Sequence, residues 1–257
     1  MIEKAKWLDP RAQATPSIQD SVNIPVSELA SRRHELPARF DSVLVADVGH
    51  EAGLAHSWLK ENGRTAEIGS GFEYGETCQG RLWSPNAFLE RSVTEIPVGK
   101  ALDLACGSGR DAVFLASCGF EVTAVDHLSD AIEMGERLEQ QYVGSSRPIS
   151  WARVDLDNGS PAGRFDLVTC FYYLNRKLLE RICDLLNPGG HLVVETFTAE
   201  HRAKFGKPRS EDLVLKPGEL LKIAAELSVL EYEEGWYGDR HTARLHAFLD
   251  PLHAQSS

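Results

Sequence analysis

Residues 101–109 read ALDLACGSG, and this stretch decides the fold of the larger part of the chain. Ala101–Leu104 is an apolar run with one acid, and the turn that follows holds Gly107 and Gly109. The next residues, RDAVFLASC at 110–118, are typical of a helix. A strand, a glycine-rich turn and a helix bring bare backbone against a nucleoside-type ligand, because glycine has no Cβ to keep the ligand away. The stretch therefore predicts a nucleotide-binding α/β domain.

A second strand pattern, EVTAVD at Glu121–Asp126, ends in a carboxylate. An acid at the end of the second strand of such a domain accepts hydrogen bonds from the hydroxyls of a ribose. Asp126 is therefore expected to bind a ribose-bearing cofactor.

Strand and helix patterns alternate from Ala101 onward, which predicts a mostly parallel sheet with helices on both faces. Two late strand patterns, Val229–Glu233 and Ala243–Leu249, are joined by the turn-like GWYGD and predict a closing hairpin at the sheet edge. The expected strands are 101–104, 121–126, 150–154, 165–171 and 191–197, and the expected helices are 110–118, 129–142 and 176–186. The NPGG turn at 187–190 is expected to end the last of these helices.

The composition is that of an ordinary globular protein, with 257 residues and a net charge of −11. This negative charge argues against nonspecific binding to nucleic acid or to an anionic membrane. No apolar run is long enough to span a bilayer, and the N-terminus lacks the apolar core of a signal peptide. The cysteines form no C-x-x-C pair, so we expect reduced thiols and a cytoplasmic location. They are Cys78, Cys106, Cys118, Cys170 and Cys183.

The chain is expected to have two domains. Residues 1–70 predict a small, separate α/β unit, residues 71–86 a linker rich in glycine and polar residues, and residues 87–257 the cofactor-binding domain. No metal site is expected, because His50 and His56 are six residues apart on a loop and a helix.

Over roughly residues 83–250 the chain resembles the class I S-adenosylmethionine-dependent methyltransferases. DLACGSG matches the acid-and-glycine turn of that family, with Ala105 where the first glycine usually stands. FDLVTCF at 165–171 and NPGG at 187–190 match the fourth strand and the turn before the fifth. The resemblance implies a Rossmann-like seven-stranded sheet, mostly parallel with a closing antiparallel strand, and S-adenosylmethionine as cofactor.

The resemblance also assigns roles to residues. Asp103 is expected to favour the ammonium group of the donor, Asp126 to hold its ribose and Asp155 to bind the adenine amino group. The full set of expected cofactor-binding residues is Asp103, Ala105, Cys106, Gly107, Gly109, Asp126, His127, Asp155, Leu156 and Phe171.

Two alternatives stay open at this point. GSGRDA at 107–112 also satisfies the G-x-G-x-x-G/A pattern of dinucleotide-dependent oxidoreductases. Asp103 opposes that interpretation, because a carboxylate one turn before the helix repels a pyrophosphate and favours the cationic methionine end of a methyl donor. The other alternative is a non-enzymatic module that senses S-adenosylmethionine.

The residues after the fourth strand, FYYLN, lack the Asn/Asp-Pro-Pro-Tyr motif that some methyltransferases use for an amine. An aromatic floor without a clear base suits an acceptor that ionises readily, such as a thiol or a chalcogen oxyanion. GRDAVFLASCGFEVTAVD looks closest to the tellurite-resistance and thiopurine-type small-molecule enzymes. Tyr172, Tyr173 and Arg176 are expected where the acceptor enters, and the basic residues of 201–209 are expected to guide an anion. Arg81 and Trp83 are candidates to fold over the cofactor.

Residues 7–68 resemble a rhodanese domain, with WLDPR as its opening strand and VADVGHEAG as its active-site loop. The sulfur-carrying cysteine of rhodaneses is replaced here by Ala46, and the anion-binding arginine by Glu51. The resemblance implies a unit without sulfurtransferase activity, whose role would be packing or contact with a protein partner.

Overall fold

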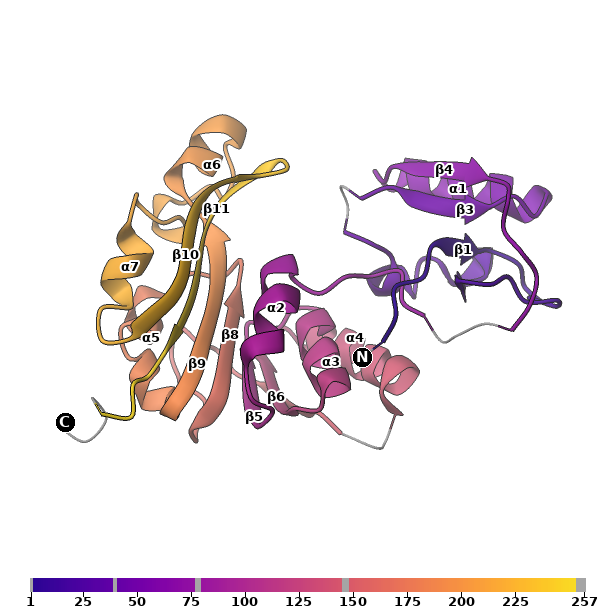
Figure 1. Cartoon of the computed structure of the whole chain (residues 1–257). Helices are drawn as coiled ribbons and strands as arrows, with labels where there is room; N and C mark the ends of the chain where they lie inside the picture. Colours follow the sequence, from indigo (N-terminus) through magenta and orange to yellow (C-terminus); the bar gives the residue numbers. More distant parts are fainter. Residues whose placement is uncertain (1, 39–40, 77–79, 145–147, 253–257) are drawn as a thin grey trace. The chain divides into compact units, whose positions relative to one another are not determined.

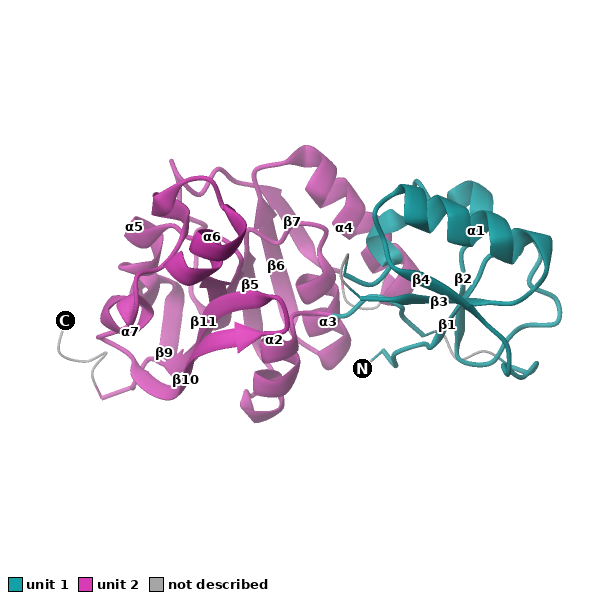
Figure 2. Ribbon diagram, turned by 90° about the horizontal axis from the view of Figure 1, so that it is seen from above, with its two compact units in different colours: residues 1–84 teal, residues 85–257 magenta. Residues whose placement is uncertain are grey.

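A computed structural model describes residues 2–38, 41–76, 80–144 and 148–252. The contacts between residues divide the chain into two compact units, Met1–Ser84 and Pro85–Ser257, which Figure 2 colours separately. In the described part of the chain, no helix has both the length and the apolar character needed to cross a bilayer.

Unit 2 is built on a seven-stranded sheet with the order β10-β11-β9-β8-β5-β6-β7. The five strands from β9 to β7 are parallel, whereas β11 runs antiparallel to β9 and β10 antiparallel to β11. The strands are β5 (Lys100–Leu104), β6 (Glu121–Asp126), β7 (Ser150–Arg153), β8 (Phe165–Phe171), β9 (Leu186–Phe197), β10 (Ser228–Tyr237) and β11 (Arg240–Phe248). The predicted Rossmann-like, mostly parallel sheet and its closing hairpin are confirmed.

Helices cover both faces of this sheet. Figure 1 shows α2, α3 and α4 on one side of it and α5 and α7 on the other. The helices are α2 (Ala87–Ser92), α3 (Arg110–Cys118), α4 (Ser129–Tyr142), α5 (Arg176–Leu179), α6 (Ala199–Phe205) and α7 (Glu219–Ile223). Short 3-10 helices lie at Val93–Glu95, Ile182–Leu185 and Glu211–Leu213.

The central strands form because their residues are buried on both faces. Leu102, Leu104 and Val168 are fully buried, and they pack with leucines of α5 and α7 in one hydrophobic core. Such near-continuous apolar runs are typical of parallel strands covered by helices on both sides. The carboxyl ends of β5, β6, β7 and β8 therefore meet at one edge, where a doubly wound sheet binds its ligand.

The region around NPGG differs from the prediction. The expected helix at 176–186 is divided into α5 and the 3-10 helix Ile182–Leu185, and β9 begins at Leu186 rather than at His191. Gly190 explains the difference, because a Cβ there would lie 2.7 Å from the carbonyl oxygen of Phe165. The turn thus passes directly against the start of β8, and Gly189 and Gly190 form hydrogen bonds with Leu249.

Unit 1 has a separate four-stranded parallel sheet with the order β2-β1-β3-β4. Its helix α1 follows β3 after the short turn Asp47–Gly49, and Ala52, Ala55 and Leu59 of this helix are buried. The elements are β1 (Trp7–Asp9), β2 (Ser21–Asn23), β3 (Val43–Ala46), α1 (His50–Glu61) and β4 (Ala66–Gly69), with 3-10 helices at Val26–Glu28 and Arg33–Glu35.

The segment expected to be a linker at 71–86 belongs mostly to unit 1. Its Glu73 carbonyl accepts a hydrogen bond from the Gln19 amide, and Arg81 forms a parallel bridge with Lys4. Leu82 is buried in the hydrophobic core of this unit. The glycines of the segment indicated a loop, but its strand-like contacts are made with residues 54 and 77 positions earlier, which no local pattern reveals.

Candidate active site

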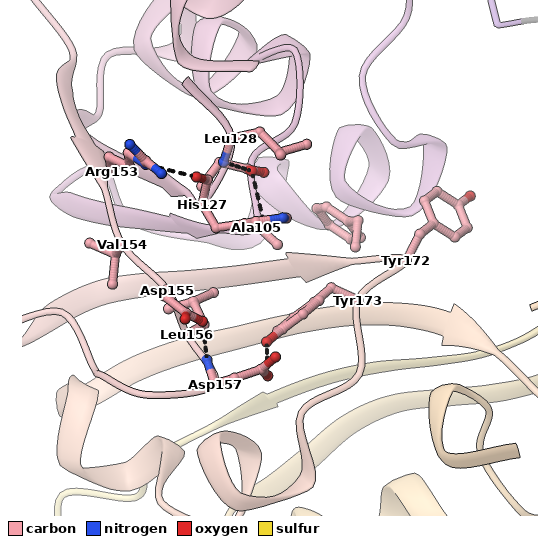
Figure 3. A pocket seen from close by; sticks show the side chains of 12 residues that line it. Ala105, His127, Leu128, Arg153, Val154, Asp155, Leu156, Asp157, Tyr172 and Tyr173 are labelled. Atoms are coloured by element: carbon pink, nitrogen blue, oxygen red, sulfur yellow. Dashed lines mark hydrogen bonds and ion pairs between the residues drawn. The ribbon is translucent and has the colours of Figure 1, made fainter. Parts of the chain in front are cut away.

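A cavity of about 670 Å³ opens where β5, β6, β7 and β8 end. Figure 3 shows the side chains that line it. Eight of the predicted site residues lie in its wall, namely Ala105, Asp126, His127, Asp155, Leu156, Phe171, Tyr172 and Tyr173. Four further wall residues, Leu128, Arg153, Val154 and Asp157, were not singled out from the sequence. Arg153 is the last residue of β7 and the other three follow β6 or β7, so their position at a strand end is the signal that could have identified them.

The glycine turn and the acid of β6 form one rim of the cavity. The Gly107 amide donates a hydrogen bond to Asp126 Oδ2 at 2.9 Å, and the Leu128 amide donates to Asp126 Oδ1 at 3.0 Å. A Cβ placed on Gly107 would meet nothing within 4 Å, so this glycine faces open space. Ala105 adopts a left-handed backbone with φ of 54°, the conformation that the usual glycine would adopt without strain.

Gly109 has a different role from the one predicted for it. A Cβ there would lie 2.5 Å from the Trp151 ring and 2.8 Å from Gly135 Cα, and φ is 77°. Gly109 therefore permits the close packing of α3 on α4 and β7 rather than the approach of a cofactor. Cys106 is also buried beneath the turn and does not line the cavity.

Asp103 lies buried in β5 behind the glycine turn. Its Oδ1 accepts a hydrogen bond from Thr169 Oγ1 at 2.9 Å, while its Oδ2 has no hydrogen-bond partner among the described residues. Burial raises the pKa of Asp103 well above its usual value, and the nearby charge of Asp111 raises it further. Burial likewise raises the pKa of Asp111 to about 6. Burial therefore favours the protonated form of both acids.

The opposite side of the cavity carries Asp155 and Asp157. The side-chain Nδ2 of Asn158 donates to Asp155 Oδ2, and the main-chain N–H of Asp157 donates to Asp155 Oδ1. These hydrogen bonds hold the pKa of Asp155 below its ordinary value. Asp155 is thus an exposed, ionised acceptor. It lies where an amino group of a base stacked in the cavity could donate to it.

Two tyrosines follow β8 on the remaining side. Tyr172 adopts a left-handed backbone with φ of 57°, and its phenol oxygen accepts a hydrogen bond from Arg240 Nη1 at 2.9 Å. The Tyr173 hydroxyl donates to Asp157 Oδ1 at 2.9 Å. Burial raises the pKa of each phenol to about 12, so both remain protonated at neutral pH.

Arg176 does not reach the cavity, contrary to the prediction. Its guanidinium forms an ion pair with Glu219 at 2.6 Å and donates to the carbonyl oxygens of Asp212 and Val214. It is the first residue of α5 and points toward the segment before α7, so it anchors that segment instead of contacting an acceptor.

The basic residues of 201–209 are also more structured than expected. His201 and Lys204 lie on α6, and Arg202 donates to the Arg209 carbonyl and pairs with Glu211. The predicted cover residues lie within unit 1. There the Arg81 guanidinium donates to the carbonyl oxygens of Ile2 and Trp83, and the Trp83 side chain is fully buried.

The residues present fit the donor that the resemblance implies. Asp126 can accept from ribose hydroxyls in addition to its two backbone amides, and the space beside Gly107 admits a ligand without a clash. Asp103 does not line the cavity and its Oδ2 is buried, so it could favour the ammonium of the methionine moiety only indirectly, as through water. No group of three or more His, Cys, Asp or Glu residues in the described chain could hold a metal ion.

Comparison with known proteins gives a family and a fold. The family model described as "Methyltransferase domain" matches residues 74–250. An uncharacterised protein of Schizosaccharomyces pombe, UNK4.09, is 26% identical over 91% of this chain and 90% of its own length. The probable S-adenosyl-L-methionine-dependent methyltransferase TehB of Haemophilus influenzae is 26% identical over 55% of this chain and 50% of its own length. Apart from the S. pombe protein, the chain spans about half the length of the first curated relatives that it matches.

Two solved structures share the fold. The N-methyltransferase NodS of Bradyrhizobium japonicum in complex with S-adenosyl-L-homocysteine has a TM-score of 0.51 at 24% identity, over 63% of this chain and 83% of that protein. The crystal structure of H. influenzae TehB has a TM-score of 0.53 at 21% identity, over 65% of this chain and 63% of that protein. Of the two cofactors that the sequence leaves open, the family match selects the methyl donor.

Proposed function

The chain belongs to the methyltransferase domain family, and we propose that this S-adenosylmethionine-dependent enzyme methylates a small molecule, either a thiol or a selenium or tellurium oxyanion. S-adenosylmethionine, when bound, supplies an electrophilic methyl group. The residues of the cavity bind and orient the donor, and most of the rate acceleration comes from the alignment of donor and acceptor.

The observation that carries the proposal is the chemistry of the β8 side of the cavity. The wall residues that end or follow β8 are Phe171, Tyr172 and Tyr173, and the ionisable groups among these three are two phenols, whereas the acids of the wall, Asp155 and Asp157, follow β7. With pKa values near 12, these phenols are protonated at neutral pH and do not act as bases. This side of the wall favours an acceptor that brings its own nucleophile, as a thiol with a pKa of about 8.5 or an oxyanion does.

The same residues favour an anionic acceptor. Arg240 donates to the Tyr172 phenol oxygen and its guanidinium lies 5.2 Å from the centre of the Tyr172 ring. This pair places a positive charge and a hydroxyl donor together at the edge of the cavity, where they would stabilise a thiolate or an oxyanion. The similarity to TehB supports this class of acceptor.

A panel assay tests the proposal. The protein is incubated with S-adenosylmethionine and with small thiols, selenite or tellurite, and the formation of S-adenosylhomocysteine is measured. We expect turnover with at least one of these acceptors, and in an Asp126→Ala variant a KM for S-adenosylmethionine that is higher by about tenfold to a hundredfold. Methylation of protein or RNA, with no turnover of any small thiol or oxyanion, would contradict the proposal.

For unit 1 we propose a rhodanese-like module without sulfurtransferase activity. Two features support it, namely a bidentate Asp9–Arg11 ion pair after β1 and a short turn between β3 and α1. β3 ends at a fully buried Ala46, which offers no thiolate at the start of that turn. Transfer of sulfur from thiosulfate to cyanide by the purified protein would contradict the assignment.

A further inference from the structure

Asn86 lies at the start of α2 and contacts three separate parts of unit 2. Its Oδ1 accepts hydrogen bonds from the Phe88 and Leu89 amides and so caps the helix. Its main-chain N–H donates to Asp111 Oδ1 at 2.6 Å. Its side-chain Nδ2 donates to Glu195 Oε2 at 2.8 Å. A helix cap needs only the first of these contacts, so the other two require a separate explanation.

The contact with Glu195 leads to the tyrosine wall of the cavity. Glu195 is buried in β9, and its other oxygen accepts from Thr242 Oγ1 at 2.8 Å and lies 3.1 Å from Arg244 Nε. The main-chain carbonyl of Glu195 accepts the amide of Tyr172 at 2.8 Å. Because Tyr172 has an unfavourable left-handed backbone, this hydrogen bond helps to keep its ring in the cavity wall.

The contact with Asp111 leads to the glycine turn. Asp111 is the second residue of α3, two positions after Gly109, and its charge acts on Asp103. Asp103 in turn carries the buried Oδ2, which forms no hydrogen bond with any residue that the structure describes. The orientation of the Asp111 carboxylate therefore affects the electrostatic environment at the methionine end of the donor site.

We propose that Asn86 is a positioning residue that holds the two walls of the donor site, the glycine turn and the Tyr172 wall, at a fixed separation. It does not contact the donor itself. The inference rests on the proposed methyltransferase site, because it concerns how tightly that site holds S-adenosylmethionine or S-adenosylhomocysteine.

A substitution that replaces the Asn86 donor by a carboxylate tests the contact between Asn86 and Glu195. Asn86→Asp keeps the helix cap but places a second carboxylate against Glu195, and we expect affinity for S-adenosylhomocysteine to fall roughly threefold to thirtyfold. In the double variant Asn86→Asp with Glu195→Gln, the glutamine Nε2 can donate to the new carboxylate while its Oε1 still accepts from Thr242. This variant is expected to recover most of the lost affinity, a coupling that a double-mutant cycle measures directly.

Asn187→Asp is the matched control. The Asn187 side chain also donates to a carboxylate, Asp166 Oδ1 at 2.7 Å, but it lies where β9 begins, away from the cavity. This variant is expected to lower the free energy of unfolding and to leave the calorimetric affinity for S-adenosylhomocysteine unchanged.

The outcomes separate this inference from the proposed function. If the wild-type protein does not bind S-adenosylhomocysteine, both the donor site and the inference fail. If the wild type binds, and Asn86→Asp lowers only the free energy of unfolding as the control does, Asn86 is a helix cap and the positioning role is wrong. Should Asn86→Asp fail to fold, the affinity for S-adenosylhomocysteine is compared among Asn86→Ala, the double variant and the wild type. Equal affinities in all three would overturn the proposal.

Discussion

The amide of Gly107 donates a hydrogen bond to the carboxylate of Asp126 at 2.9 Å. This contact joins the turn after β5 to the end of β6, so the glycine turn and the acid that we propose as the ribose ligand form one rim. Hydrogen bonds from the Gly107 and Leu128 amides hold the carboxylate of Asp126 in place. Preorganisation of this kind reduces the entropic cost of binding.

Asp126→Ala should weaken the binding of S-adenosylhomocysteine by about 1.5–3 kcal/mol, because the charge-assisted bonds to the ribose hydroxyls are lost. Isothermal calorimetry gives the affinity directly. Asp130→Ala, which removes an exposed acid in the first turn of α4, is the matched control and should bind as the wild type does. Equal affinity of Asp126→Ala and the wild type would reject the ribose assignment.

The two glycines of the turn should respond differently to substitution by alanine. Gly109→Ala would drive a Cβ into Trp151 and Gly135, and it should lower the free energy of unfolding by more than the cost of left-handed strain alone. A Cβ at Gly107 meets no atom within 4 Å, so Gly107→Ala should lower the free energy of unfolding only by the backbone strain of about 1–2 kcal/mol. Denaturant unfolding of both variants checks the order. A larger loss for Gly107→Ala would contradict the packing argument.

Arg176→Ala should destabilise the protein without affecting the donor site. The variant loses the ion pair with Glu219 and two bonds to carbonyl oxygens, worth about 1–2 kcal/mol after allowance for partial exposure. Urea unfolding measures the loss, and calorimetry with S-adenosylhomocysteine should show unchanged affinity. Weaker binding of S-adenosylhomocysteine with unchanged stability would contradict this account and indicate that Arg176 belongs to the binding site.

The buried acids should make the stability of the ligand-free protein depend on pH. The folded pKa of Asp111 is raised to about 6, so its stabilisation is complete below the unfolded pKa of about 4 and is lost as the pH rises through 6. The raised pKa of Asp103 has the same effect on the pH dependence of stability. The charge of Arg110 lowers the pKa of Asp111 and that of Glu195 raises it, while the charge of Asp126 raises the pKa of Asp103.

The melting temperature should therefore fall as the pH rises from 4.5 to about 7.5, and it should fall less in the Asp111→Asn variant than in the wild type. The asparagine keeps an oxygen that can accept the Asn86 amide, and it has no proton to lose. An identical pH profile in the variant and the wild type would contradict the raised pKa of Asp111.

Local patterns in the sequence predict the central features well, and the reason is visible in the fold. The strand before Gly107, the acid at Asp126 and the hairpin formed by β10 and β11 depend on neighbours close in the chain. Their periodicity and turn residues are therefore sufficient to predict them.

Long-range contacts account for what the sequence did not predict. Arg176 was expected at the acceptor entrance because it follows the two tyrosines, but its partner Glu219 lies 43 residues later. Asn86 has the sequence of an ordinary helix cap, and its partners Asp111 and Glu195 lie 25 and 109 residues away. Which of several polar groups will meet is decided by the packing of the sheet and not by any local pattern.

Calorimetric titration of the protein with S-adenosylhomocysteine, with NAD as the control ligand, tests the central claim most directly. The cavity at the ends of β5, β6, β7 and β8 predicts micromolar binding of S-adenosylhomocysteine and no binding of NAD. Binding of NAD alone, or of neither ligand, would contradict the assignment of this cavity to the methyl donor.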